Sequence, residues 1–170
     1  MRPSMSKATV LAIAGCFTLN VSFAGEGAWT FTTADRGHPE LKYSKDDQSI
    51  FYVGCGHAFG IHAVYPGPRK QDGTRVAITL SNSQARMKLK GEIASGYEGD
   101  PPNTTHFVQW DLGFRRQDPD LYAEKWRKIE RRLFDLLDAG KPLTVSAEDR
   151  SYTLPAVNVR DWKTQFEKRC

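Results

Sequence analysis

The segment 54–57 (Gly-Cys-Gly-His) brings a thiol and an imidazole close together in the sequence. A thiolate with a histidine two residues further on has the composition of a nucleophile and its base. However, Cys55 continues the alternation of Phe51 and Val53, which predicts a side chain that faces the core. The flanking glycines also interrupt the pleat that would place Cys55 and His57 on one face. We therefore predict a structural cysteine and no catalytic thiol.

The remaining candidates for chemistry do not form a recognised constellation. The four histidines are His38, His57, His62 and His106, and none has the spacing of a metal-binding motif. His57 and His62 could converge across a bend. Acidic pairs lie where turns or a helix start are expected, at positions 46 and 47, 98 and 100, and 118 and 120. With no nucleophile elbow, phosphate loop or dinucleotide fingerprint, the sequence predicts no catalytic residue, no metal and no cofactor.

Basic residues are concentrated on one predicted helix. Its solvent-facing positions include Lys125 and a group of four that form a possible anion-binding site: Arg127, Lys128, Arg131 and Arg132. Glu124 and Glu130 are expected to offset part of this charge. Residues 86, 88 and 90 form a second basic row, and residues 69 and 70 a third basic site. If these groups share a surface they would attract a polyanion or an anionic lipid headgroup, although such residues more often serve only solubility.

Short segments with a period of two predict a β-rich domain. The expected strands lie near residues 29–32, 41–43, 49–55, 59–65, 76–80, 86–90, 108–112, 143–145 and 152–154. Loops are predicted at 66–73 and 94–103, where glycine and proline are frequent. A long helix is predicted over about 119–139, with Asp118 as its cap and Gly140 as its stop, and a short one over about 159–169. Without βαβ alternation, these elements indicate an α+β fold with an antiparallel sheet or sandwich of about eight short strands.

The N-terminal 24 residues have the three parts of a secretory signal peptide. Arg2 and Lys7 form the basic region, residues 8–17 the apolar stretch, and the small residues at 22 and 24 the cleavage site. We therefore expect a signal peptide at 1–24, one globular domain at 25–170, and a periplasmic or secreted protein. The segment 13–16 (Ile-Ala-Gly-Cys) also resembles a lipobox, so a lipoprotein anchored through Cys16 is the alternative.

The net charge of the mature domain is small. The whole chain carries +4, but without Arg2 and Lys7 the mature domain has 22 basic and 20 acidic residues. A net charge of +2 gives no reason to expect a nucleic-acid partner.

Two cysteines remain in the mature chain, and we predict that they form a disulfide. Export leads into an oxidising compartment, where a pair of cysteines is ordinarily bridged. Cys55 lies on the inward parity of its strand. Cys170 follows Phe166 and Trp162 at intervals of four, on the apolar face of the last helix. Packing of that face onto the sheet would bring Cys55 and Cys170 together.

The mature segment resembles small exported proteins of Gram-negative bacteria to which no function is assigned. The resemblance rests on residues 29–31 after a signal peptide, on 53–55, on the long helix running into 141–145, and on the tail from 152 to Cys170. It is more loosely similar to the invasion-associated locus B family of periplasmic β-rich proteins. The resemblance implies a periplasmic β-rich fold and no catalytic residue.

The sequence thus favours a non-enzymatic envelope protein that binds a partner, such as another envelope protein or an anionic polymer or lipid headgroup. An enzyme, for example a hydrolase, whose site is assembled from dispersed residues is the alternative, and a polar pocket containing His57, His62 or an acidic pair would favour it. A periplasmic enzyme inhibitor is a third hypothesis, which a protruding loop at 94–103 would favour.

Overall fold

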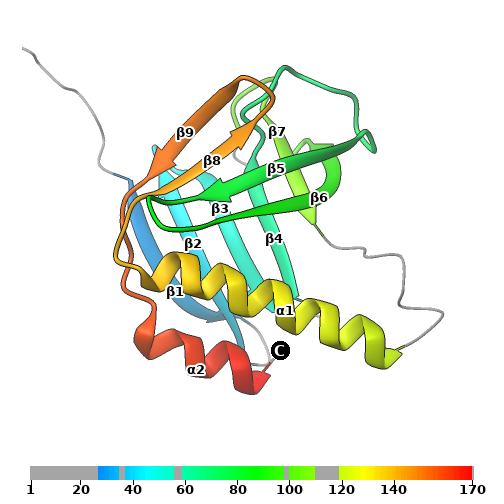
Figure 1. The fold of residues 1–170 in the computed structure, drawn as a ribbon. Helices are drawn as coiled ribbons and strands as arrows, with labels where there is room; N and C mark the ends of the chain where they lie inside the picture. Colours follow the sequence, from blue (N-terminus) through cyan, green and yellow to red (C-terminus); the bar gives the residue numbers. More distant parts are fainter. Residues whose placement is uncertain (1–26, 35–36, 56–58, 98–99, 110–118, 170) are drawn as a thin grey trace, which may run out of the picture.

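A computed structural model describes residues 27–34, 37–55, 59–97, 100–109 and 119–169 (Figure 1). The expected signal peptide and Cys16 lie outside these residues, as do His57, Asp118 and Cys170. The described residues form nine strands and two helices.

The nine strands form one antiparallel sheet that curls into a half-barrel (Figure 1). They are β1 (Ala28–Ala34), β2 (His38–Lys45), β3 (Gln48–Cys55), β4 (Phe59–Val64), β5 (Arg75–Ser81), β6 (Arg86–Ser95), β7 (Thr105–Gln109), β8 (Leu143–Ala147) and β9 (Arg150–Leu154). Their order in the sheet is β1-β2-β3-β4-β7-β6-β5-β8-β9.

The expected β-rich fold with two helices is confirmed, but the sandwich of about eight strands is wrong. Strand β7 pairs with β4 on one side and with β6 on the other, so it joins the two groups of hairpins into a single sheet. The natural twist of neighbouring strands then curls this long sheet. Helices, rather than a second sheet, cover its apolar face.

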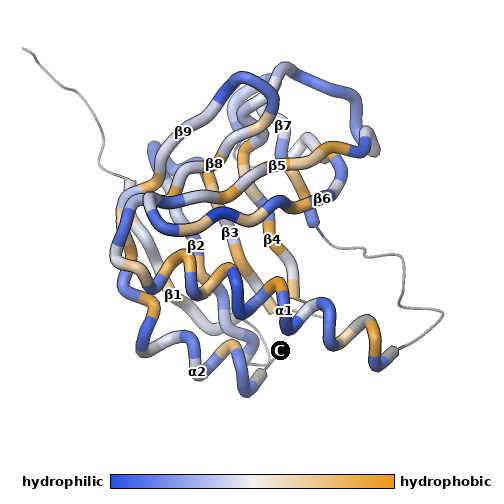
Figure 2. Tube along the Cα trace, viewed as in Figure 1, coloured by the Kyte–Doolittle hydropathy of each residue, from blue (hydrophilic) through white to orange (hydrophobic). Residues whose placement is uncertain are grey.

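The two helices pack together against the inner face of the sheet. Helix α1 (Pro119–Asp138) is followed by Gly140 in a left-handed conformation (φ 60°), and α2 (Arg160–Arg169) begins after Asn158, whose Oδ1 accepts a hydrogen bond from the Arg160 amide (3.2 Å). Phe134 and Phe166 join the helices, with ring centroids 4.9 Å apart. Figure 2 shows hydrophobic and hydrophilic residues alternating along α1, as an amphipathic helix requires.

The alternation expected in the strand near 49–55 is confirmed. Phe51 and Val53 are fully buried and Cys55 is 3% exposed, and Phe59 pairs with Cys55 across the β3–β4 hairpin. The inward residues of the other strands join the same core. The residues between them consequently face away from the helices, and this outer face is where polar side chains collect.

Some boundaries differ from the expected ones. Strand β6 continues to Ser95, so the following loop starts later than residue 94, and β7 ends at Gln109, with Trp110 and Leu112 outside the described residues. Strand β2 is longer than the segment 41–43 because it pairs with both β1 and β3. Among the described residues, neither helix combines the length and the apolar character needed to cross a membrane.

Candidate functional site

A cavity of about 360 Å³ lies on the outer face of the sheet, away from the helices. The sheet contributes Lys42, Ser49, Tyr52, His62 and His106 to its walls. Two loops contribute Asp47, Tyr97 and Asp100. We call these eight residues the tyrosine–histidine pocket.

Strand register places the central residues of the pocket side by side. Lys42 pairs with Tyr52 between β2 and β3, and Tyr52 pairs with His62 between β3 and β4. Each of the three alternates with buried residues of its own strand, so all three project from the outer face. They form a row across the sheet that is half-buried because a loop covers it.

The loop after β6 closes the row through a buried hydrogen-bonded pair of histidine and aspartate. Nε2 of His106 lies 2.6 Å from Oδ2 of Asp100, and the two side chains are only 6% and 8% exposed. A turn after Asp100, in which the Thr104 amide donates to the Pro101 carbonyl (3.1 Å), returns the chain to β7. The carboxylate fixes the orientation of the His106 ring, as a charge-assisted hydrogen bond does.

Four rings form a continuous series of contacts in the pocket. Tyr52 meets His62 with centroids 5.4 Å apart, His62 meets Tyr97 at 6.1 Å, and Tyr97 meets His106 at 5.0 Å. All three contacts are tilted or edge-on, the arrangement that aromatic quadrupoles favour. Tyr97 nevertheless stays 42% exposed, so it forms the accessible part of the pocket wall.

The environment of the pocket shifts two of its ionisable groups. Burial, and to a smaller extent the charge of His106, hold the pKa of His62 below its ordinary value. The imidazole of His62 is therefore neutral at pH 7 and offers one donor and one acceptor. Burial and the hydrogen bond from Tyr52 Oη to Glu40 (2.8 Å) raise the pKa of Tyr52, which keeps this phenol protonated.

Asp47 reaches the pocket from a tight turn. It forms with Asp46 the two-residue connection between β2 and β3, and both have positive φ angles (61° and 50°). Two left-handed residues define a type I′ turn, which favours Asn-Gly. The chain has an aspartate at the position where glycine would be most relaxed, and this aspartate lines the pocket.

The pocket gathers residues that the sequence had left apart. No sequence motif links His62 with His106, but the structure places both in one cavity together with members of two acidic pairs, Asp47 and Asp100. Cys55 is on the opposite, buried side of β3. Tyr52 and Tyr97 belong to no sequence motif. The pocket could have been suspected only from Tyr52 and His62, two rings at solvent-facing positions of adjacent strands.

The four basic residues of the possible anion site lie outside this pocket. Arg127, Lys128, Arg131 and Arg132 are exposed on α1, and in the described part of the chain none of them has an ion-pair partner. The carboxyl of Glu130 interacts with the charges of Arg127 and Arg131. Glu130 is 6% exposed because it faces the inside of the helix pair, where burial and the neighbouring Glu167 raise the pKa of its carboxyl.

The described residues contain no group of three or more His, Cys, Asp or Glu side chains arranged to hold a metal ion. Comparisons of the chain with protein-family models, with curated proteins and with solved structures found no match.

Proposed function

We propose that this chain is an exported, non-enzymatic envelope protein that binds a saccharide unit in the tyrosine–histidine pocket. Export rests on the signal peptide expected at residues 1–24. The binding role rests on the cavity itself, whose walls include four rings and the buried His106–Asp100 pair. Its volume of about 360 Å³ is at the small end of the range of about 300–1,000 Å³ that ligand sites occupy.

The walls match the two kinds of surface on a sugar ring. The C–H face of a sugar packs on an aromatic ring, and Tyr97 presents an accessible ring at the mouth. Sugar hydroxyls both donate and accept hydrogen bonds. Asp47 accepts, Lys42 donates, and Ser49 and the neutral His62 do both.

The charges of the pocket favour a ligand without a large net charge. Lys42 and Asp47 contribute one charge of each sign, and Asp100 is already paired with His106. A strongly anionic ligand would be repelled by Asp47, and a strongly cationic ligand would be repelled by Lys42. A neutral, hydroxyl-rich ring meets none.

Binding to a panel of sugars tests the proposal. Saturation-transfer NMR with neutral monosaccharides and disaccharides is expected to show at least one ligand for the wild-type protein, and its affinity is expected to fall about tenfold or more in Tyr97→Ala. Leu121→Ala removes a side chain of similar exposure from α1, away from the pocket, and serves as the control. Equal binding by wild type and Tyr97→Ala would contradict the proposal.

A hydrolase with a dispersed site is the second candidate, because one observation favours it. A neutral imidazole, His62, lies beside a histidine that is oriented by a buried carboxylate, and such pairs perform general acid–base catalysis. Turnover of a sugar that binds, lost in His62→Gln and in Asp100→Asn, would establish this activity. Binding without turnover would leave the binding role.

The third hypothesis, a periplasmic enzyme inhibitor, stays a prediction. Tyr97 and Asp100 of the loop after β6 both contact His106, and residues 98 and 99 lie outside the described residues.

A further inference from the structure

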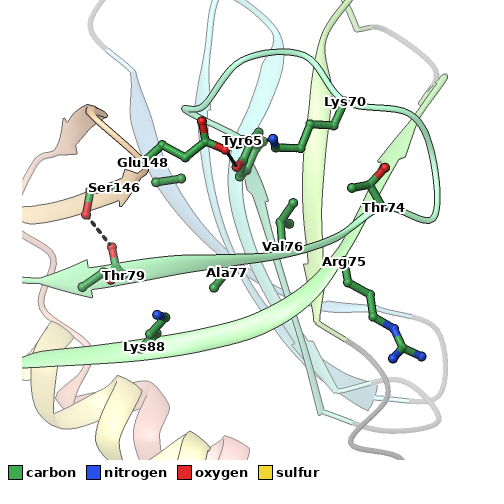
Figure 3. A pocket seen from close by; sticks show the side chains of 11 residues that line it. Tyr65, Lys70, Thr74, Arg75, Val76, Ala77, Thr79, Lys88, Ser146 and Glu148 are labelled. Carbon is green, nitrogen blue, oxygen red and sulfur yellow. Dashed lines mark hydrogen bonds and ion pairs between the residues drawn. The ribbon is translucent and has the colours of Figure 1, made fainter.

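A second cavity, of about 400 Å³, opens where strands β5 and β8 separate. Pairing between them covers only Thr79 to Ser81 of β5 and ends at the pair Thr79–Ser146. Beyond this point β5 extends back to Arg75, while β8 continues into the β8–β9 turn. The two strands therefore form a fork, which the loop between β4 and β5 covers (Figure 3).

The fork leaves backbone polar groups without a strand partner. On its other side β5 pairs with β6 from Arg75 onward, but among the described residues nothing pairs with its β8-facing edge before Thr79. Backbone N–H groups in such a position need water or a ligand as a hydrogen-bond partner. The hydroxyls of Thr79 and Ser146 lie at the same place, with Ser146 Oγ donating to the Thr79 carbonyl (3.4 Å).

A fixed polar network forms one wall of the fork. Glu148 accepts hydrogen bonds from Lys70 Nζ (2.9 Å) and Tyr65 Oη (3.2 Å), and these bonds are visible at the top of Figure 3. The bond with Lys70 lowers the pKa of Glu148 and raises the pKa of Lys70, so both are charged at neutral pH. The ammonium of Lys70 is thereby held at the cavity, and its charge is balanced by Glu148.

A second lysine adds a positive charge to the cavity. Lys88 of β6 lies next to Thr79 in the register and lines the cavity from the side opposite to Lys70, as Figure 3 shows. In the part of the chain that the structure describes, Lys88 has no ion-pair partner. Arg75 adds positive charge at the rim, although its guanidinium points away from the other labelled groups in Figure 3.

We propose that this fork is a binding site for a small oxyanion: a phosphate or sulfate group, free or attached to a larger molecule. Lys88 supplies the charge, and Lys70, Thr79 and the open edge of β5 supply hydrogen-bond donors to the anion oxygens. The site brings together one residue each from the two smaller basic groups, 69–70 and 86–90. It is separate from the tyrosine–histidine pocket, with which it shares no lining residue.

Titration with inorganic phosphate, followed by backbone amide NMR at constant ionic strength, tests the proposal. Saturable shifts are expected at Thr79, Lys88 and Ser146. Lys88→Ala is expected to weaken binding about tenfold, the effect of one lost charge-assisted hydrogen bond. Lys90→Ala is the matched control, because Lys90 is equally exposed two residues further along β6 and does not line the cavity.

Three outcomes would overturn the site: no saturable shift with phosphate, shifts centred elsewhere, or equal loss in Lys88→Ala and Lys90→Ala. Methyl phosphate, tested in parallel, distinguishes a free ion from a pendant group, because only a site open to a substituent binds both. Sugar binding in Lys88→Ala is expected to equal that of wild type, so failure of this site and failure of the sugar pocket give different results.

Discussion

Asp47 combines an unfavourable backbone conformation with a position in the pocket. A non-glycine residue at positive φ costs roughly 1 kcal/mol, although aspartate tolerates this region better than most residues. Asp46 has the same conformation but does not line the pocket. Comparing substitutions at the two positions therefore separates the effect of the turn on stability from the effect of the pocket on binding.

Replacing Asp47 by glycine is expected to stabilise the protein and weaken sugar binding. Relief at positive φ should raise the free energy of unfolding by about 0.5–1 kcal/mol in urea denaturation. Loss of the carboxylate should reduce sugar affinity severalfold. Asp46→Gly should give a similar gain in stability with unchanged affinity. Equal affinities in the two variants would remove Asp47 from the binding site.

The pKa of His62 makes stability depend on pH. Because burial holds the folded-state pKa below the unfolded value of about 6.5, the unfolded chain binds more protons between the two values. The free energy of unfolding should therefore decrease as the pH falls from about 6.5 through the folded-state pKa. NMR titration of the His62 ring should give a midpoint below 6.5, and His62→Asn should remove this part of the pH dependence. A midpoint at or above 6.5 would contradict the burial of the ring.

Individual residues of the pocket were only partly predictable from the sequence. The outward parity of His62 followed from local alternation, since inward and outward positions repeat every two residues. The presence of Asp47 and Asp100 in one pocket could not be predicted in this way. These residues are 53 positions apart in the sequence and come together only through the order of the strands. The His106–Asp100 pair depends on how one loop folds back, which composition does not determine.

At the scale of elements, α1 divides its charges between two surfaces. Asp135 and Asp138 pair with Lys163 and Arg160 of α2, at 3.2 Å and 3.5 Å, while Glu130 is buried. The acidic side chains in the C-terminal half of α1 are thus either paired with α2 or buried. The four exposed cations in the middle of the helix are left to form a positive face, which we propose as a surface for polyanions.

Heparin chromatography tests this face. Reversal of Arg131 and Arg132 to glutamate is expected to reduce the salt concentration needed for elution, and to reduce its dependence on salt, because fewer counterions are released. Reversal of Lys45 and Lys141, exposed residues outside the helix, is the matched control. The same loss of retention in both double variants would show only a general effect of net charge.

The proposed Cys55–Cys170 disulfide gains support from the packing of α2. Phe59, the strand partner of Cys55, lies with its ring centroid 6.5 Å from that of Phe166. This contact brings α2 close to the end of β3 that contains Cys55. Cys170 is outside the described residues, so the bridge itself stays a prediction.

Loss of this bridge should destabilise the protein strongly. A closed loop of more than a hundred residues predicts about 4–5 kcal/mol in the chain-entropy model. The double variant Cys55→Ser/Cys170→Ser, and wild type treated with reductant, should both melt at a much lower temperature. Titration of two free thiols in unreduced exported protein would refute the bridge.

Elements were more predictable than their arrangement. Both helices and nearly all strands lie close to the predicted segments, because periodicity, caps and turn residues act locally. The sequence left a single sheet and a sandwich as alternatives, because the choice between them depends on β7. This strand lies between β4 and β6, and its residues 105–109 are buried on both faces, so they carry no alternation that would show where the strand belongs.

At the scale of the whole molecule, the half-barrel separates the apolar core from the polar outer face. The two helices fill the inner face, where Leu133, Phe134 and Phe166 are almost fully buried. The outer face does not contribute to that core, so it can carry the polar tyrosine–histidine pocket at little expense to folding. The fork between β5 and β8 places a second polar site at an end of the sheet where strand pairing stops.

Ring-resolved NMR during a sugar titration tests the central claim most directly. With isotope-labelled tyrosine and histidine, the rings of Tyr52, His62, Tyr97 and His106 are predicted to shift together and saturably with one dissociation constant. The ring of Tyr152, which is hydrogen-bonded to the Val64 carbonyl (2.9 Å) outside the pocket, should not respond. Shifts centred on Tyr65 or Tyr152, or no saturable shift with any neutral sugar, would contradict a saccharide site in the tyrosine–histidine pocket.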